Sequence, residues 1–216
     1  RESGIPREEI FLTTKIWTND FGYAKTKTAI QRSLTALQTE YIDLMLLHQQ
    51  VGDTLGSWKA LEEGVDQGIF RSIGVSNFSI DNMKKLLAVA RIPPVVNQVE
   101  AHPFAQQKEL RAFLEPYGIR MEAWYPIGHG DQRLLHHPVL ETIARKHHKT
   151  TVQIILRWHI QTGYIVFPKS TNPAHIRDNM DIFDFALSPE DMRQIDGLDQ
   201  NKEYFRYPPL FLRKFL

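Results

Sequence analysis

Tyr41-Ile42-Asp43-Leu44-Met45-Leu46-Leu47-His48 is the stretch of sequence that decides the fold. It is a short apolar run that ends in a polar residue, which is typical of a buried strand. Residues 54–67 follow with apolar side chains three and four positions apart, which predicts an amphipathic helix. A second apolar run at residues 72–76 completes a strand, a helix and a parallel strand.

The same alternation extends in both directions along the chain. Further strands are predicted at Ile10–Lys15, Val95–Val99, Ile119–Trp124 and Ile165–Pro168. Further helices are predicted at Lys25–Leu37, Ile80–Ala90, Gln107–Leu114, Pro138–His147, Thr151–Gln161, near Ala174 and after the capping residue Ser188. Strands that alternate with helices indicate an α/β fold with a parallel sheet.

Two architectures fit this pattern: an open doubly wound sheet and a closed eight-stranded barrel. A dinucleotide-binding open sheet usually has a Gly-x-Gly-x-x-Gly turn after its first strand, and the sequence has none. Polar residues instead recur where the predicted strands end, which is where a barrel builds its site. We therefore predict a parallel (β/α)8 TIM-barrel type fold that lacks its first two strands, in a single partial domain over residues 1–216.

Composition restricts the classes of partner. The 216 residues carry a net charge of +1, which gives no basic field for nucleic acid or for an anionic membrane. Cysteine is absent, which excludes disulfides and thiolate sites and is compatible with a cytoplasmic location. No apolar run approaches the roughly 20 residues of a membrane span. The expected partner is a small molecule, and the oligomeric state is undetermined.

Lys15 and His48 each end a predicted strand. Taken singly, each is more often a structural residue than a functional one. Together, two ionisable groups at the ends of adjacent strands could polarise a carbonyl group and tune a proton donor. Histidines also occur as the adjacent pairs 136–137 and 147–148, but adjacent residues do not share a helix face, so no metal site is predicted.

Amides and hydroxyls follow the next strands. Ser76, Asn77 and Gln98 could grip a planar amide through paired donors and acceptors, although helix capping by Asn77 or Ser79 and strand-edge pairing by Gln98 are equally open. Trp124 could stack on a heterocycle or plug the barrel. Lys169, Ser170 and Thr171 precede a helix and form a possible anion site, or an ordinary helix cap.

Five segments in order resemble signatures of the aldo-keto reductase superfamily. They are Phe11–Trp17, Tyr41–His48, Ile73–Phe78, Asn97–Pro103 and Phe167–Ser170, and the resemblance covers roughly residues 5 to 200. The chain looks most like the bacterial group of 2,5-diketo-gluconate reductases and aldehyde or methylglyoxal reductases. The resemblance implies NADPH-dependent reduction of an aldehyde or ketone to an alcohol, on a barrel that binds the cofactor without a Rossmann fold.

By position, the resemblance also implies roles for individual residues. Lys15 and His48 match two catalytic residues, and Trp17 and His48 would contact substrate. Ser76, Asn77 and Gln98 match the residues that hold the nicotinamide carboxamide, and Trp124 matches the aromatic that stacks on its ring. Lys169, Ser170 and Thr171 match the segment that receives the 2′-phosphate. His175 stands where NADPH-preferring members usually carry arginine, which implies that NADH is tolerated. Asp178 and Asn179 match positions that face adenine.

The family also uses an aspartate and a tyrosine in a motif resembling Asp-x-Ala-x-x-Tyr, and residues 1–14 do not contain it. Residues 1–216 by themselves are therefore expected to reduce aldehydes far more slowly than an intact relative. Three hypotheses remain open: a reductase whose N-terminal segment is missing from this sequence, an inactive nucleotide-binding or interaction remnant of the fold, and a different barrel enzyme that uses Lys15 in a Schiff base.

Overall fold

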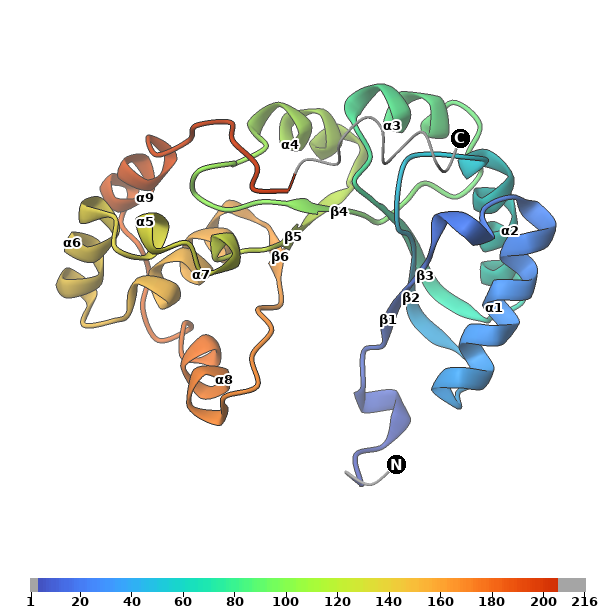
Figure 1. The fold of residues 1–216 in the computed structure, drawn as a ribbon, viewed down its shortest axis with the longest axis horizontal. Coiled ribbons are helices and arrows are strands. Elements are labelled where there is room, and N and C mark those ends of the chain that lie inside the picture. Colours follow the sequence, from blue (N-terminus) through green and yellow to red (C-terminus); the bar gives the residue numbers. More distant parts are fainter. Residues whose placement is uncertain (1–3, 206–216) are drawn as a thin grey trace. The chain divides into compact units, whose positions relative to one another are not determined.

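The computed structural model describes residues 4–205, which contain six parallel strands that follow one another in chain order in the sheet (Figure 1). The strands are β1 (Thr13–Ile16), β2 (Ile42–Leu47), β3 (Phe70–Ser76), β4 (Val96–Glu100), β5 (Arg120–Trp124) and β6 (Ile165–Val166). The helices are α1 (Tyr23–Leu37), α2 (Thr54–Asp66), α3 (Ile80–Leu87), α4 (Lys108–Leu114), α5 (Gln132–Leu135), α6 (Pro138–His147), α7 (Thr151–Thr162), α8 (Pro173–Met180) and α9 (Pro189–Asp196). The chain divides into two compact units, residues 4–97 and 98–205.

In the first unit, β2 pairs with β1 on one side and with β3 on the other, and α1 and α2 lie beside these strands (Figure 1). All six residues of β2 are buried, which explains why the stretch is a continuous apolar run rather than an alternating one. Leu47 stands opposite Ile16 and Val75 in this register. Because the strands are parallel, their carboxyl ends meet at one edge.

Gly74 is required for close packing in the middle of β3. A Cβ atom at this position would lie 2.7 Å from the Leu46 side chain and 2.9 Å from the Val96 carbonyl oxygen. Leu44, Leu46 and Val96 form a buried apolar cluster beside it. A larger residue would push neighbouring strands apart, so Gly74 is explained by strand packing.

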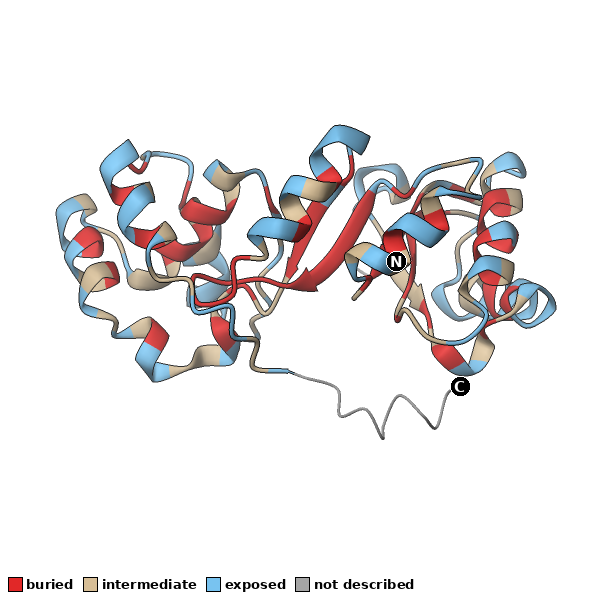
Figure 2. Ribbon diagram, turned by 90° about the horizontal axis from the view of Figure 1, so that it is seen from above, coloured by how far each residue is buried: buried red, intermediate tan, exposed pale blue. Residues whose placement is uncertain are grey.

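In the second unit, β5 pairs with β6; helices α4, α5, α6, α7 and α9 each bury residues, which are red in Figure 2, whereas α8 buries none. The polar groups of the buried residues on α7 are satisfied: Trp158 Nε1 donates to Asp196 Oδ1 over 2.9 Å, and both ring nitrogens of His159 hydrogen-bond backbone carbonyls. Burial lowers the pKa of His159 to about 4, so this histidine is a neutral core residue.

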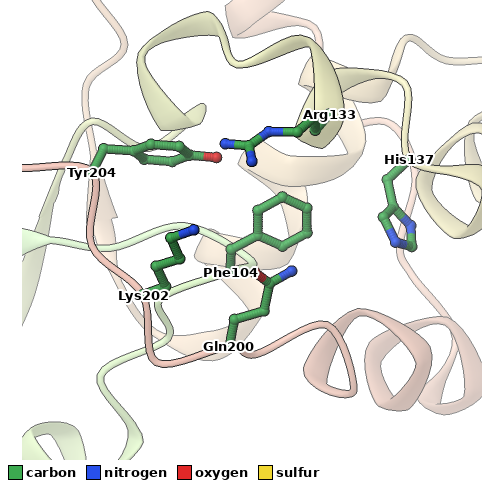
Figure 3. Close-up of a pocket in the computed structure, with 6 residues that line it drawn as sticks. All are labelled: Phe104, Arg133, His137, Gln200, Lys202 and Tyr204. Carbon is green, nitrogen blue, oxygen red and sulfur yellow. The ribbon is translucent and has the colours of Figure 1, made fainter.

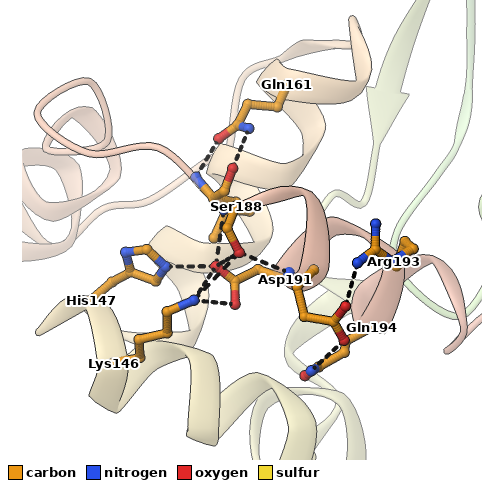
Figure 4. A network of polar contacts seen from close by, with 9 residues as sticks. Lys146, His147, Gln161, Ser188, Asp191, Arg193 and Gln194 are labelled. Carbon is orange, nitrogen blue, oxygen red and sulfur yellow. Dashed lines mark hydrogen bonds and ion pairs between the residues drawn. The ribbon is translucent and has the colours of Figure 1, made fainter.

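Helix α9 begins at the predicted capping residue Ser188, which forms a capping box: Ser188 and Asp191 hydrogen-bond each other's backbone N–H groups (Figure 4). Lys146 Nζ and His147 Nε2 each lie 2.9 Å from the Asp191 carboxylate. Burial alone would raise the pKa of Asp191, but the bonds from His147, Lys146 and Ser188 hold it well below its usual range. His147 is thus part of an ion-pair network that joins α6 to α9.

The predicted order of strands and helices is confirmed, with differences at the boundaries. Strand β1 begins at Thr13 rather than Ile10, and β6 covers only Ile165–Val166. Both are end strands in the sheet order, so each has a strand partner on one side only within residues 4–205. Helix α5 was not predicted; its four residues are too few for a periodic signal. None of the helices in the described range is long and apolar enough to cross a membrane.

Candidate active site

Lys15 and His48 lie close enough to influence each other in the first unit. Burial lowers the pKa of His48 to about 4, and the positive charge of Lys15 contributes to the shift. The His48 imidazole is therefore neutral at neutral pH, when it can hydrogen-bond a carbonyl group without carrying charge. The Trp17 ring meets His48 edge to face, with ring centroids 4.7 Å apart. The structure thus brings together the two predicted catalytic residues and Trp17.

Ser76 and Asn77 lie beside this group at the end of β3. Asn77 Nδ2 donates to the His48 carbonyl oxygen and to Ser76 Oγ, each over 3.2 Å. Asn77 has a left-handed backbone with φ of 61°, which asparagine tolerates better than most residues. The Asn97 amide fixes the next residue by bonding both the N–H and the carbonyl of Phe78. Asn77 is not a helix cap, because Ser79 takes that role for α3.

Asp43 belongs to the opposite end of β2. Its side chain is 1% exposed and pairs with Arg7 at 2.8 Å and with Arg71 at 2.9 Å. Burial alone would raise the pKa of Asp43, but the Leu12 N–H and the two guanidinium groups lower it. His48 is five positions further along the chain than Asp43, about 17 Å away in an extended strand. Asp43 therefore lies away from the group around His48, and its carboxylate stabilises the start of the sheet.

Two buried polar side chains at the functional edge were not predicted. Thr18 and Gln49 lie two residues beyond the paired positions Ile16 and Leu47. Thr18 Oγ1 and Gln49 Nε2 are buried and have no hydrogen-bond partner among the described residues. A buried donor without a partner is rare, because losing its hydration costs about 1–3 kcal/mol. The sequence signal is weak: both are polar residues just after apolar strands.

Gln98 carries a similar unpaired amide in the second unit. Its side chain lies on β4 and is 2% exposed, and within residues 4–205 its Nε2 has no hydrogen-bond partner. The Nε2 of Gln98 therefore does not take part in strand-edge pairing. A buried amide that donates to nothing fits a ligand that supplies an acceptor, such as a carboxamide oxygen.

Trp124 at the end of β5 is flanked by aromatic rings. Tyr125 stacks on it with centroids 3.8 Å apart and an interplanar angle of 14°, and Phe205 meets it edge to face at 5.5 Å. Because Tyr125 covers one face of Trp124, a ligand ring could stack only on the other face.

Glu100 holds the segment that carries Phe205. Its side chain is buried, accepts a hydrogen bond from Phe205 N over 2.9 Å and lies 3.0 Å from His102 Nε2; Tyr204 N also donates to it. The Tyr204 hydroxyl donates to Asp131 over 2.6 Å. These bonds belong to an aromatic segment at residues 204–211, whose Phe205 lies beside Trp124 and whose residues 206–211 lie outside the described range.

Lys169, Ser170 and Thr171 precede α8, but the helix cap is the next residue, Asn172, which accepts from Ala174 N over 2.9 Å. Ser170 Oγ accepts from Asn172 N over 3.1 Å. Lys169 and Thr171 are exposed and keep their side chains for other contacts. On α8, His175, Asp178 and Asn179 are three and four positions apart and share one side.

The predicted residues thus form three groups. Lys15, Trp17, His48, Ser76 and Asn77 gather in the first unit, Gln98 and Trp124 lie on the neighbouring strands β4 and β5, and the remaining six lie on or before α8. Within the described range no cluster of three or more His, Cys, Asp or Glu residues could hold a metal ion.

Comparisons with known proteins agree on one family. The model of the aldo/keto reductase family matches residues 2–200. Glyoxal reductase of Bacillus subtilis is 47% identical over 203 residues, which cover 94% of this chain and 73% of that protein. An aldo-keto reductase from a Medee basin deep-sea metagenome library superimposes with a TM-score of 0.93 at 42% identity, covering 95% of this chain and 77% of that one. A Bombyx mori aldo-keto reductase in complex with NADP superimposes with a TM-score of 0.89 at 34% identity, and the match covers 95% of this chain and 73% of that one.

Proposed function

Because this chain belongs to the aldo/keto reductase family of NAD(P)H-dependent oxidoreductases, we propose that it reduces an aldehyde or ketone to an alcohol with NADPH. The observation that carries the proposal is the buried, unpaired Nε2 of Gln98. Such a group is costly unless a ligand pairs with it, and a nicotinamide carboxamide has the required acceptor. The Bombyx mori relative was solved with NADP, which supports the phosphorylated cofactor.

The residues present fit this cofactor in three places. Ser76, Asn77 and Gln98 would hold the carboxamide, and the face of Trp124 that Tyr125 leaves free would stack on the nicotinamide ring. The exposed Lys169 and Thr171, with Ser170, would receive the 2′-phosphate. His175, Asp178 and Asn179 would lie toward the adenosine. When bound, the cofactor supplies the hydride for the carbonyl carbon.

Lys15 and His48 would act on the carbonyl oxygen. Neutral His48 would donate a hydrogen bond that orients the carbonyl group, and the Lys15 cation would stabilise the negative charge that develops there. Lys15 would also lower the pKa of a nearby proton donor. Residues 1–216 offer no match to the family's catalytic tyrosine and aspartate. In this proposal Lys15 and His48 therefore assist a proton donor that does not come from the five matched segments.

We propose small aldehydes with a second oxygen nearby as the preferred substrates. Thr18 and Gln49 adjoin Trp17 and His48 and have unpaired polar atoms, which a hydroxyl or second carbonyl on the substrate would satisfy. The similarity to a glyoxal reductase points the same way. Because the chain lacks cysteine, we also propose a reducing, cytoplasmic location.

The test is the loss of NADPH absorbance when the whole protein that contains residues 1–216 meets glyoxal or propanal. We expect aldehyde-dependent oxidation, faster with glyoxal. The alternative, an inactive nucleotide-binding or interaction remnant, predicts NADPH binding without oxidation. A barrel enzyme that uses Lys15 in a Schiff base would instead give a lysine adduct on borohydride treatment.

His175 gives a prediction about cofactor choice. Arginine grips a phosphate with two parallel bonds and is always charged, whereas histidine changes its charge between about pH 5 and 8. The preference for NADPH over NADH should therefore strengthen as the pH falls from 8 to 6. His175→Arg should raise the preference roughly 3- to 10-fold at pH 8 and make it independent of pH.

The measurement is the ratio of kcat/KM for NADPH and NADH in the whole protein. Arg177→Lys, on the same helix, is the control and should leave the ratio unchanged. A ratio that neither varies with pH nor responds to His175→Arg would mean that His175 does not face the phosphate.

A further inference from the structure

A small pocket in the second unit is lined mainly by hydrogen-bond donors. Its volume is about 180 Å³, and its lining residues are Phe104, Arg133, His137, Gln200, Lys202 and Tyr204 (Figure 3). None of them belongs to the candidate cofactor or catalytic residues. The space would hold about six waters at roughly 30 Å³ each, and it is well below the ~300 Å³ of a pocket for a drug-sized molecule. The occupant must therefore be small.

Two cations face this pocket with donors to spare. Among the described residues, the Lys202 ammonium group has no hydrogen-bond or ion-pair partner. Arg133 binds Asp131 through Nε and Nη2, at 2.6 Å for the shortest contact, and Nη1 takes no part in these bonds; the guanidinium also interacts with the Tyr204 hydroxyl. No carboxylate lines the pocket. Its net charge is therefore positive even after Asp131 is counted against Arg133.

The remaining walls add neutral donors and an apolar floor. His137 Nδ1 accepts a hydrogen bond from Val139 N over 3.3 Å, so the ring proton is on Nε2 and available as a donor. The Gln200 side-chain amide has no partner within the described range. Phe104, which is 6% exposed, stands between these groups and packs edge to face against His137.

The wall that bears Lys202 is fixed in place. The backbone N–H groups of Gln200 and Lys202 both donate to the Phe104 carbonyl oxygen, over 2.9 and 3.2 Å. The Tyr204 hydroxyl is engaged with Asp131 over 2.6 Å and so does not compete for a ligand. The backbone that carries Gln200 and Lys202 is thus held by existing bonds rather than ordered on binding, which lowers the entropy lost when a ligand binds.

We propose that this pocket binds a small anion, a phosphate or a short carboxylate, through Lys202, Arg133 Nη1 and the amide and imidazole donors. The proposal does not rest on the proposed reductase function. Oxyanions satisfy several N–H donors at once, and bonds between charged partners are about twice as strong as neutral ones.

The test is calorimetric titration of the whole protein with inorganic phosphate and, separately, with malonate, against sodium chloride. We expect one saturable site in the millimolar range or tighter for at least one of the two anions; the stronger binder identifies the chemistry. Lys202→Gln should weaken binding about 10-fold or more, and Arg133→Gln should also weaken it. Both residues are exposed, so neither substitution removes a core contact.

Two control variants locate the site. Arg145→Gln removes an exposed cation of the same unit that does not line the pocket, and Lys169→Gln removes the lysine of the candidate 2′-phosphate segment. Arg145→Gln should leave the affinity unchanged, whereas Lys169→Gln tests whether the anion binds at the candidate 2′-phosphate segment instead of in this pocket. Binding lost with Lys169→Gln but not with Lys202→Gln would overturn the proposal, as would the absence of saturable binding by either anion.

Discussion

Lys15→Met in the whole protein is expected to lower kcat/KM for an aldehyde about 10²–10³-fold, the usual loss when one preorganised electrostatic group is removed from an active site. The structural basis is the placement of Lys15 next to His48, whose pKa its positive charge helps to lower. Removing the cation removes both the stabilisation of the developing negative charge and the influence on a proton donor.

The same substitution gives a second, independent readout. Without the Lys15 charge, the pKa of His48 should rise from about 4, because one of its two lowering causes is gone while burial remains. Histidine NMR signals followed against pH would show this. Lys25→Met, an exposed lysine at the start of α1, is the control and should change neither rate nor pKa. A Lys15→Met variant with near-normal turnover would remove Lys15 from the mechanism.

Asp43→Ala is expected to lower the free energy of unfolding by about 2–3 kcal/mol, equal to a fall in Tm of roughly 4–12 °C. Asp43 is buried and accepts from Arg7, Arg71 and Leu12 N, so the substitution strands three donors. This loss of unfolding free energy is smaller than the largest losses known for buried ion pairs. The reason is that the side chains of Arg7 and Arg71 are 27% and 54% exposed and keep some hydration.

The pH dependence of this effect follows from the lowered pKa of Asp43. A folded-state pKa below the unfolded one stabilises the fold fully above the unfolded value, near 3.8, and the stabilisation is lost as the pH falls through the folded value. Urea unfolding at pH 7 is the measurement. Asp66→Ala, which breaks an exposed pair with Arg91, should lose less than about 1 kcal/mol. Equal losses in the two variants would contradict the role assigned to Asp43.

The arrangement of the strands, and the residues that end them, could be predicted from sequence. Apolar runs that alternate with amphipathic helices imply that the strands are parallel. Lys15, His48, Ser76 and Gln98 follow or end apolar runs, and parallel strands place their carboxyl ends at a common edge. What these side chains contact could not be predicted. Asn77 and Ser79 are both plausible caps, and only the backbone of α3 shows that Ser79 is the one used.

Contacts between residues that are far apart in the sequence could not be predicted either. Asp43 pairs with Arg7, which is 36 residues away, and Glu100 binds the backbone of Phe205, 105 residues away. A carboxylate in an apolar strand indicates a partner without naming it. Short or edge elements were also misjudged: α5 has four residues and β6 has two, and tertiary contacts rather than local pattern set such lengths.

The most direct test of the central claim is transfer of deuterium to glyoxal by the whole protein from NADPH that carries deuterium at both C4 positions of the nicotinamide. The proposed reductase function predicts that deuterium appears on the new alcohol carbon, one atom for each NADPH oxidised, and that Lys15→Met slows the transfer. Tight NADPH binding with no deuterium in any product, from glyoxal or from propanal, would contradict the reductase function. That result would favour the inactive nucleotide-binding or interaction remnant.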